Sequence, residues 1–199
     1  MFYELPEIRN ELRSVVQYTG AFTDEEVQKI HDYIELTSFK SGGLRKGILG
    51  DNGNQDNEYR DSNVFWVEST MEIHWVFERF GHLINKINRD FWNYELTGFH
   101  PLQYTEYESG GQYNWHQDSS NDTRSVNRKL SFSMMLSDEN EFTGGKFQLC
   151  DDGPERIKTI SPKKGDILFF PSHISHRVTP VEEGKRKSLV GWVVGPRGV

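Results

Sequence analysis

The amino-acid sequence predicts a mainly β fold with flanking α-helices, arranged as a double-stranded β-helix (jelly roll). From residue 99 onward, short segments rich in β-forming residues alternate with turns that contain glycine. Two longer segments with helical spacing of apolar residues precede them. Several short strands after a helical part are typical of a jelly roll. We expect one domain over residues 1–199, with helical support in 1–98 and the jelly-roll core in 99–195.

Two helices are expected in the first half of the chain. Thr23 followed by Glu26 forms a capping-box pattern, which predicts a helix that begins there and continues to about Thr37. A second helix is expected over residues 71–92, because apolar residues recur there at helical spacing. These apolar residues are Ile73, Val76, Phe77, Phe80, Leu83, Ile84, Ile87 and Phe91.

The segment between these helices, residues 38–61, is rich in glycine, asparagine and aspartate. A loop of this length is typical of a lid or a binding loop, and an irregular surface connection is equally compatible with the composition. Residues 62–67 then predict a short strand.

The strands of the second half are predicted from β-forming segments that glycine-containing turns separate. Their expected ranges are 99–108, 129–136, 146–150, 157–160, 166–171, 177–181 and 188–194. In a jelly roll, strands that are distant in the sequence lie side by side. Residues from separate segments can therefore meet at one site.

The composition limits the partners and the compartment. The 23 basic and 30 acidic side chains give a net charge of −7, which disfavours nucleic acid as the main partner. Cys150 is the only cysteine, so an intramolecular disulfide is impossible and a reducing compartment is expected. No segment has the length of an apolar membrane span, and the first residues lack the apolar core of a signal peptide. We therefore expect a soluble, cytoplasmic protein with no membrane partner.

Residues 107–118, YESGGQYNWHQD, contain a pair of possible metal ligands. On an extended chain, His116 and Asp118 project to the same side and can hold one ion together. An imidazole and a carboxylate suit Fe(II), and one further histidine would complete a facial triad with open coordination positions. A polar pair in a solvated turn is the alternative for this motif alone.

Residues 165–181, GDILFFPSHISHRVTPV, supply the further histidine. A buried apolar strand enters a turn there, and His176 then begins another strand. His173 competes for the role, but His176 is favoured because Val178 and Val181 continue the strand from it. The other histidines lie in helical or pre-proline contexts and are expected to be surface or capping residues, namely His31, His74, His82 and His100.

These spaced motifs resemble the prolyl 4-hydroxylase branch of the Fe(II)/2-oxoglutarate-dependent dioxygenases, and among them most closely the PKHD-type hydroxylases. The resemblance covers roughly residues 20–195. Its elements agree in order, and they are Tyr107-x5-Tyr113-x2-His116-x-Asp118, then Gly144-Gly145, then His176-x9-Arg186-x5-Trp192.

The resemblance implies a role for each matching residue. His116, Asp118 and His176 would bind iron, and Arg186 would pair with the distal carboxylate of 2-oxoglutarate. A guanidinium can hold a carboxylate with two parallel hydrogen bonds, which agrees with this role. A solvated basic cluster at the start of a strand is the alternative for Arg186. Tyr107 matches a tyrosine whose hydroxyl contacts the same carboxylate.

Other matches are less specific. Tyr104 is an alternative to Tyr107, and either residue could instead be an aromatic core residue. Trp192 resembles an aromatic residue that closes the cosubstrate pocket, although any buried tryptophan on a strand would look the same. Arg60 and Arg128 resemble positions near the family's peptide site, and surface salt bridging is their alternative role.

The implied activity is hydroxylation of a peptidyl residue, with proline the leading choice, and release of succinate and CO2. The implied cofactors are Fe(II), 2-oxoglutarate and O2, and ascorbate is a further candidate. The carboxylate of Asp118 favours hydroxylation over halogenation, because related halogenating enzymes have a small residue at this position.

Several alternatives stay open. The same chemistry could act on a free amino acid, a small metabolite or a nucleic-acid lesion. A non-enzymatic cupin-like or lectin-like binding jelly roll would share the strands, but it has no need of the spaced ligands. A structural zinc site usually has a closed set of cysteines and histidines, which one cysteine cannot supply.

Overall fold

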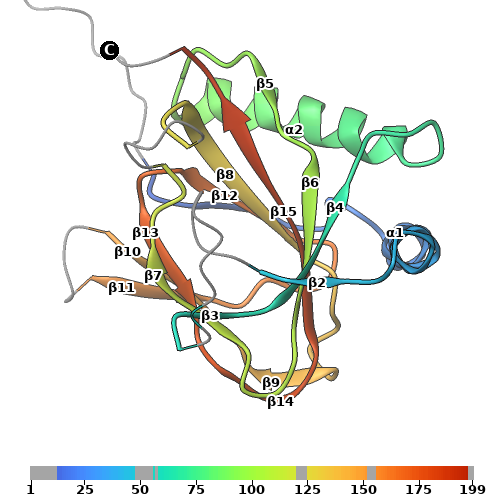
Figure 1. The fold of residues 1–199 in the computed structure, drawn as a ribbon. Coiled ribbons are helices and arrows are strands. Elements are labelled where there is room, and N and C mark those ends of the chain that lie inside the picture. The colour runs from blue at the N-terminus through green and yellow to red at the C-terminus, as the bar shows by residue number, and fades with distance from the viewer. Residues whose placement is uncertain (1–12, 48–55, 57, 120–124, 152–155, 197–199) are drawn as a thin grey trace, which may run out of the picture.

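The computed structural model of the chain describes residues 13–47, 56, 58–119, 125–151 and 156–196. Two antiparallel sheets face one another, and two helices lie outside them (Figure 1). The helices are α1 (Asp24–Lys40) and α2 (His74–Phe91). Neither helix is long and apolar enough to cross a membrane, within the residues described.

The larger sheet has eight strands. In spatial order they are β1 (Val16–Tyr18), β12 (Ile167–Pro171), β8 (Arg128–Met135), β15 (Arg186–Val194), β6 (Leu102–Tyr107), β4 (Asn63–Val67) and β2 (Arg45–Lys46), while β5 (Gly98–Phe99) pairs separately with β15.

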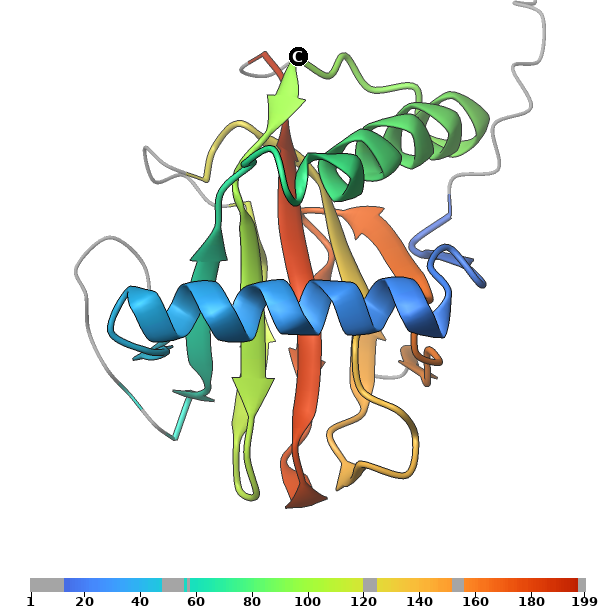
Figure 2. The ribbon, with the colours of Figure 1, turned by 90° about the vertical axis from the view of Figure 1, so that its right-hand side faces the viewer.

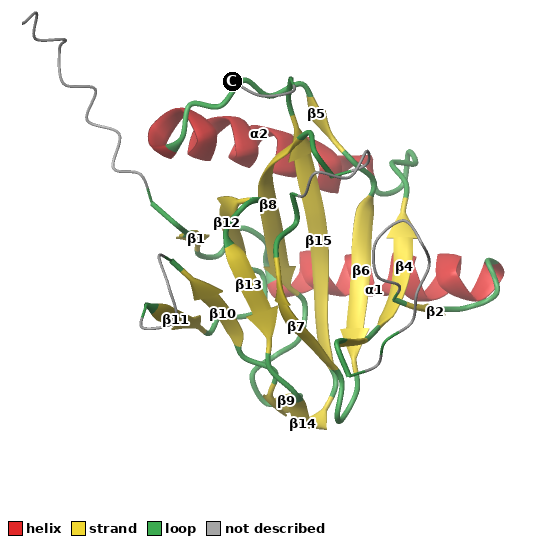
Figure 3. Ribbon diagram, turned by 60° about the vertical axis from the view of Figure 1, so that its left-hand side comes forward, coloured by secondary structure: helices red, strands yellow, loops and turns green. Residues whose placement is uncertain are grey.

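The smaller sheet has five strands, and a pair of strands closes one end of the molecule (Figure 3). The five are β11 (Ile157–Ile160), β10 (Phe147–Cys150), β13 (Ser175–Val178), β7 (Gln112–His116) and β3 (Arg60–Asp61). The closing pair is β14 (Val181–Gly184) and β9 (Phe142–Gly144). The predicted jelly roll with flanking helices is confirmed.

Two predicted strands are each divided in the structure, and both divisions occur at an X-Pro step. The strand expected over 99–108 separates into β5 and β6 at His100-Pro101. The strand expected over 177–181 separates into β13 and β14 at Thr179-Pro180. Proline has no backbone N–H to donate, so it interrupts the ladder of hydrogen bonds.

The segment 38–61 differs from the loop that its composition predicts. Residues 38–40 are the last turn of α1, and the short strands β2 and β3 lie within the segment. Both strands join the sheets, so the N-terminal part contributes strands as well as helices. The predicted lid falls on residues 48–55 and 57, which lie outside the described residues.

The helix α1 begins as its capping box predicts. The Thr23 hydroxyl accepts a hydrogen bond from the Glu26 backbone N–H at 3.3 Å, and the Thr23 N–H donates to the Glu26 carboxylate at 2.9 Å. The same carboxylate accepts two hydrogen bonds from Arg79 of α2, at 2.6 and 2.7 Å. This bidentate pair joins the two helices, which both lie on the outer face of the larger sheet (Figure 2).

The two faces of the larger sheet have different roles. Side chains alternate along a strand, so on β8 the buried Phe132 and Met134 pack in the apolar cluster that also holds residues of both helices. Ser131 and Ser133 lie on the opposite face of the strand, and Ser133 lines the space between the sheets. Small and polar residues on that inner face leave room for a cavity.

Gly191 on β15 is a tight packing position that can be tested by mutation. It lies opposite Phe132 in register, and a Cβ at residue 191 would overlap the Phe132 ring. We expect Gly191→Ala to lower the free energy of unfolding by about 1–3 kcal/mol. Gly81→Ala in α2 is the control, because its Cβ would meet no atom within 4 Å. That change should raise the free energy of unfolding, measured with urea, by about 0.5–1 kcal/mol. Equal effects of the two substitutions would contradict the close packing of Gly191 against Phe132.

Candidate metal centre

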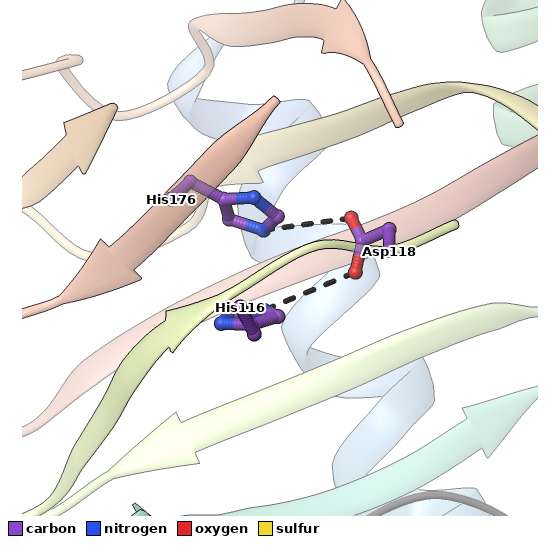
Figure 4. Close-up of side chains that lie close together, drawn as sticks. All are labelled: His116, Asp118 and His176. Carbon is purple, nitrogen blue, oxygen red and sulfur yellow. Dashed lines mark ion pairs between the residues drawn. The ribbon is translucent and has the colours of Figure 1, made fainter. Parts of the chain in front are cut away.

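Three side chains meet between the two sheets. His116, Asp118 and His176 each offer one ligand atom, and these atoms lie within 4.8 Å of one another (Figure 4). Nε2 of His176 is 3.5 Å from Oδ2 of Asp118, and Nε2 of His116 is 3.9 Å from Oδ1. Separations of this size allow one ion to contact all three groups.

The backbone fixes where these side chains meet. His116 on β7 and His176 on β13 are direct partners in the antiparallel register. Asp118 follows β7, where its N–H and that of Ser119 both donate to the Ser172 carbonyl, at 2.9 and 3.0 Å. Ser172 is the first residue of the turn after β12, so these hydrogen bonds hold two chain segments together beside the triad.

Both imidazoles are oriented by a hydrogen bond to the main chain. Nδ1 of His116 donates to the Asn114 carbonyl at 2.7 Å, and Nδ1 of His176 donates to the Ile174 carbonyl at 3.0 Å. A carbonyl oxygen can only accept, so in a neutral ring the proton resides on Nδ1. The lone pair is then on Nε2, which faces Asp118 and is the atom a metal would bind.

Ring packing restricts the histidines further. The Tyr113 ring stacks on His116 with centroids 3.5 Å apart, and the Phe170 ring meets His176 edge-on at 4.7 Å. These contacts leave little freedom for the imidazoles to turn away from Asp118.

The protonation states suit a metal ligand set. Burial, reinforced by the neighbouring His176, lowers the pKa of His116 to about 3, so this imidazole is neutral. Burial alone would raise the pKa of Asp118. His176, His116 and a hydrogen bond from Ser131 outweigh it, and the carboxyl is held ionised with its pKa below the usual value. Metals bind neutral imidazole and ionised carboxylate, so neither His116 nor Asp118 has to lose a proton before it binds a metal at neutral pH.

The donor set fits Fe(II). Two imidazoles and one carboxylate form a facial triad, which leaves the other coordination positions of the ion open to small ligands. No cysteine belongs to the group within the described residues, which is unlike most structural zinc sites.

The triad lines a cavity of about 860 Å³ between the sheets. Every second residue of β15 from Arg186 to Val194 faces this cavity. Arg186 lies at one end, and Trp192 and Val194 lie at the other. The cavity therefore extends along roughly 20 Å of strand between Arg186 and Trp192.

Arg186 is a buried cation that points into this cavity. Its side chain is 2% exposed, and Nη1 donates to the Ser188 hydroxyl at 3.3 Å. No carboxylate of the described residues forms an ion pair with it, and Nε has no hydrogen-bond partner among them. Burial lowers the pKa of Arg186 from its usual value, although the group stays charged. A buried unpaired charge is costly, so this end of the cavity favours an anionic ligand.

Tyr107 and Tyr104 have different surroundings. Tyr107 faces Arg186 across the β6–β15 pair and lines the cavity, and the guanidinium carbon is 5.6 Å from its ring centroid. Tyr104 lies on the opposite face of β6, where its hydroxyl donates to Glu106 at 3.2 Å. The structure therefore brings Tyr107 to the cavity and leaves Tyr104 in the helix-facing core. Gly145 packs against Arg186, because a Cβ there would lie 3.0 Å from Cδ of the arginine.

The less specific matches also line the cavity. The Arg128 guanidinium lies over the Trp192 ring at 4.2 Å from its centroid. Arg60 donates to the Ser62 hydroxyl at 3.0 Å and to the Gln103 side-chain oxygen at 3.1 Å, and it lies over the Tyr113 ring at 4.6 Å. The surface location considered for these arginines is not observed for Arg60, which is 8% exposed.

His100 and Asn127 line the cavity although the sequence did not single them out as site residues. His100 was expected at the surface because it precedes a proline. The structure places its Nε2 atom in the interior instead. This position depends on how β5 and β6 join the larger sheet, and no local sequence pattern reports it. His173, the competitor of His176, is exposed in the turn between β12 and β13.

Comparisons with known proteins agree with the geometry. The family model of the 2OG-Fe(II) oxygenase superfamily matches residues 102–194. A PKHD-type hydroxylase of Idiomarina loihiensis is 39% identical over 87 residues, which are 44% of this chain and 38% of that protein. Another, from Acidovorax ebreus, is 23% identical over 177 residues, 84% of this chain and 72% of that protein. The chain thus matches less than half of the length of the more similar curated relatives.

Solved structures share the fold. A prolyl-4-hydroxylase of Pseudomonas putida superposes with a TM-score of 0.73 at 18% identity, covering 92% of this chain and 93% of that one. A prolyl hydroxylase of Trichoplax adhaerens, in complex with a peptide fragment of the hypoxia inducible factor oxygen degradation domain, gives 0.76 at 20% identity, covering 91% and 83%.

The histidine pair His176 and His173 provides a matched test of the metal centre. We expect His176→Ala to weaken Fe(II) or Mn(II) binding by at least about 100-fold. Loss of a residue that only orients a metal ligand already costs about 10- to 100-fold in affinity. His173→Ala should bind the metal as the wild type does, because this side chain is exposed outside the group. Calorimetric titration of the metal-free proteins measures both affinities. Equal affinities of the two variants would contradict the proposed ligand set.

Proposed function

We infer that the chain is related to the 2OG-Fe(II) oxygenase superfamily, because that family model matches residues 102–194 and PKHD-type hydroxylases are similar to it in sequence. We propose that it is an Fe(II)- and 2-oxoglutarate-dependent oxygenase that hydroxylates a peptidyl residue, with proline the leading choice, and releases succinate and CO2. The observation that carries the proposal is that the triad and a buried, anion-seeking arginine share one cavity.

In this proposal His116, Asp118 and His176 hold Fe(II). The bound metal supplies the redox chemistry that couples O2 and 2-oxoglutarate to oxidation of a C–H bond. The protein contributes by fixing the ligands, through the main-chain hydrogen bonds to both imidazoles and the ring stack on His116. The ionised Asp118 keeps a third protein ligand in place, which favours hydroxylation over halogenation.

Arg186 and Tyr107 would bind the distal carboxylate of 2-oxoglutarate. The guanidinium has an Nε donor that no described residue satisfies, and a carboxylate could accept from it. Pairing would also neutralise the buried charge. Because Arg186 lies at one end of the cavity and faces into it, it would orient the cosubstrate along the space toward the triad.

The apolar walls near the triad would keep water from the reacting groups. Phe147, Phe170 and Val178 are buried residues of the cavity lining, and two of them pack against the ring of His176. Exclusion of water limits side reactions of a reactive oxidant with solvent.

A peptide substrate is favoured by the relatives. One structural neighbour is a prolyl hydroxylase in complex with a peptide, and another is a prolyl-4-hydroxylase. Arg60, Arg128 and Trp192 line the same cavity and are proposed to contact the substrate or to close the pocket. We further propose a cytoplasmic location, since a single cysteine and a ferrous cofactor both suit a reducing compartment.

The proposed activity is tested by incubating the Fe(II)-loaded protein with 2-oxoglutarate, O2, ascorbate and a panel of proline-containing peptides. The expected result is a peptide product that has gained one oxygen atom, with succinate formed in equal amount. If a free amino acid added to the same assay were oxidised and the peptides were not, the substrate would be a small molecule and not a peptide. Absence of any 2-oxoglutarate-dependent succinate would refute the enzyme class.

Replacement of Arg186 should weaken 2-oxoglutarate binding without lowering the stability of the ligand-free protein. Arg186→Met removes the partner of the cosubstrate carboxylate, so 2-oxoglutarate binding should weaken by about 2–5 kcal/mol, or at least roughly 30-fold. The ligand-free variant should be no less stable than the wild type, because an unpaired buried charge is replaced by an apolar side chain of similar shape.

Lys185→Met is the control for this experiment. Lys185 is adjacent in sequence but half-exposed, and it pairs with Glu106 and Glu108 away from the cavity. Calorimetry with 2-oxoglutarate and urea unfolding should show unchanged cosubstrate affinity for this variant. If Arg186→Met instead bound 2-oxoglutarate normally, the role of the guanidinium would be disproved.

A further inference from the structure

At the end of the cavity away from Arg186, three buried polar atoms lack hydrogen-bond partners within the described part of the chain. They are Nε2 of His100, Oδ1 of Asn127 and Nε1 of Trp192. All three residues line the cavity. Buried polar side-chain atoms nearly always have a partner, because an unsatisfied one loses its hydration without compensation. Their partner is therefore expected among the molecules that enter the cavity.

The main chain holds these residues around the last residues of β15. The His100 N–H donates to the Trp192 carbonyl at 3.1 Å, and the Gly195 N–H donates to the Asn127 carbonyl at 3.0 Å. Trp192 is also a paired residue of the β8–β15 ladder. Such backbone bonds fix the side chains before a ligand arrives, which reduces the entropy lost on binding.

The chemistry of the three groups is complementary to an amide. The Trp192 indole can only donate, the Asn127 oxygen can only accept, and the imidazole of His100 can do either. Burial, with a smaller effect of the Arg128 charge, lowers the pKa of His100, so its ring is neutral at pH 7. A peptide main chain presents N–H donors and C=O acceptors side by side without charge.

This group of atoms lies close to the metal centre. Trp192 is the register partner of Ser131 on β8. The Ser131 hydroxyl is hydrogen-bonded to the Ser172 hydroxyl at 2.9 Å, and the Ser172 carbonyl accepts from the Asp118 N–H. A molecule that reached the triad from this end would pass the three polar atoms. A contact here would therefore involve groups adjacent to the residue being oxidised.

We propose that His100, Asn127 and Trp192 form a subsite that binds a main-chain amide of an extended peptide next to the target residue. The inference rests on the proposed function and adds how the substrate class is recognised. A free amino acid has no amide to offer and would leave the three buried groups unsatisfied. Sites built to form hydrogen bonds discriminate strongly against ligands that lack the matching groups.

The test measures peptide binding without turnover. Wild-type protein loaded with Fe(II) and 2-oxoglutarate is titrated anaerobically by calorimetry with acetyl-Ala-Ala-Pro-Ala-Ala-amide, with its analogue that has an ester in place of the Pro-Ala amide, and with L-proline. The peptide should bind at least about tenfold more tightly than the ester or L-proline, because the ester lacks the N–H that Asn127 would accept.

Variants then assign this preference to the subsite. Asn127→Leu should bind the peptide about tenfold more weakly and no longer distinguish amide from ester, which is the coupling expected of a direct contact. His100→Leu should also weaken peptide binding. His82→Leu is the control, because His82 is an exposed histidine of α2. In the Zn(II)-loaded protein, the indole N–H resonance of Trp192, assigned with Trp192→Phe, should shift on peptide addition.

The outcomes separate the subsite from the enzyme class. Equal binding of amide and ester by the wild type, or L-proline binding as tightly as the peptide, would overturn the inference while leaving 2-oxoglutarate turnover intact. Retained discrimination in Asn127→Leu would overturn it as well. Discrimination by the wild type that Asn127→Leu abolishes, in a protein that forms no succinate, would support the subsite and defeat the proposed activity.

Discussion

The antiparallel pairing of β7 with β13 is the constraint on which the whole site depends. It places His116 directly opposite His176, although the two residues lie far apart in the sequence. A slip of this register by one residue would turn one imidazole to the other face of the smaller sheet and remove it from the group. The hydrogen bonds of Asp118 and Ser119 to Ser172 fix the end of β7 in the same way. The geometry of the three side chains is a consequence of sheet register.

The cavity has two ends of different chemistry, and the triad lies along it. One end holds a buried guanidinium without an ion-pair partner among the described residues, which suits a dicarboxylate cosubstrate. The other end carries neutral hydrogen-bond donors and acceptors. There the Arg128 guanidinium also lies over the Trp192 ring. Among the described residues, both ends contain buried polar atoms without a hydrogen-bond partner. Such buried, unpartnered groups lower the stability of the folded protein, which is typical of sites where a ligand supplies the missing partners.

The sequence predicted the fold class and both helices, because each depends on local patterns. The capping box of Thr23 fixed the start of α1, and the spacing of His116, Asp118 and His176 indicated the residues that the structure brings together. Short strands such as β1 and β3 were not predicted, since two or three residues carry no periodicity and pair only through tertiary contacts. The position of His100 was misjudged for the same reason. Its burial follows from the pairing of distant strands and not from its neighbours in the sequence.

The most direct test of the proposed iron and cosubstrate sites is a crystal structure of the protein grown anaerobically with Fe(II) and 2-oxoglutarate, with an anomalous map recorded at the iron edge. We expect one iron peak bound by His116, Asp118 and His176, and cosubstrate density that reaches from the iron to the Arg186 guanidinium. An iron peak elsewhere, or 2-oxoglutarate bound away from Arg186, would contradict it.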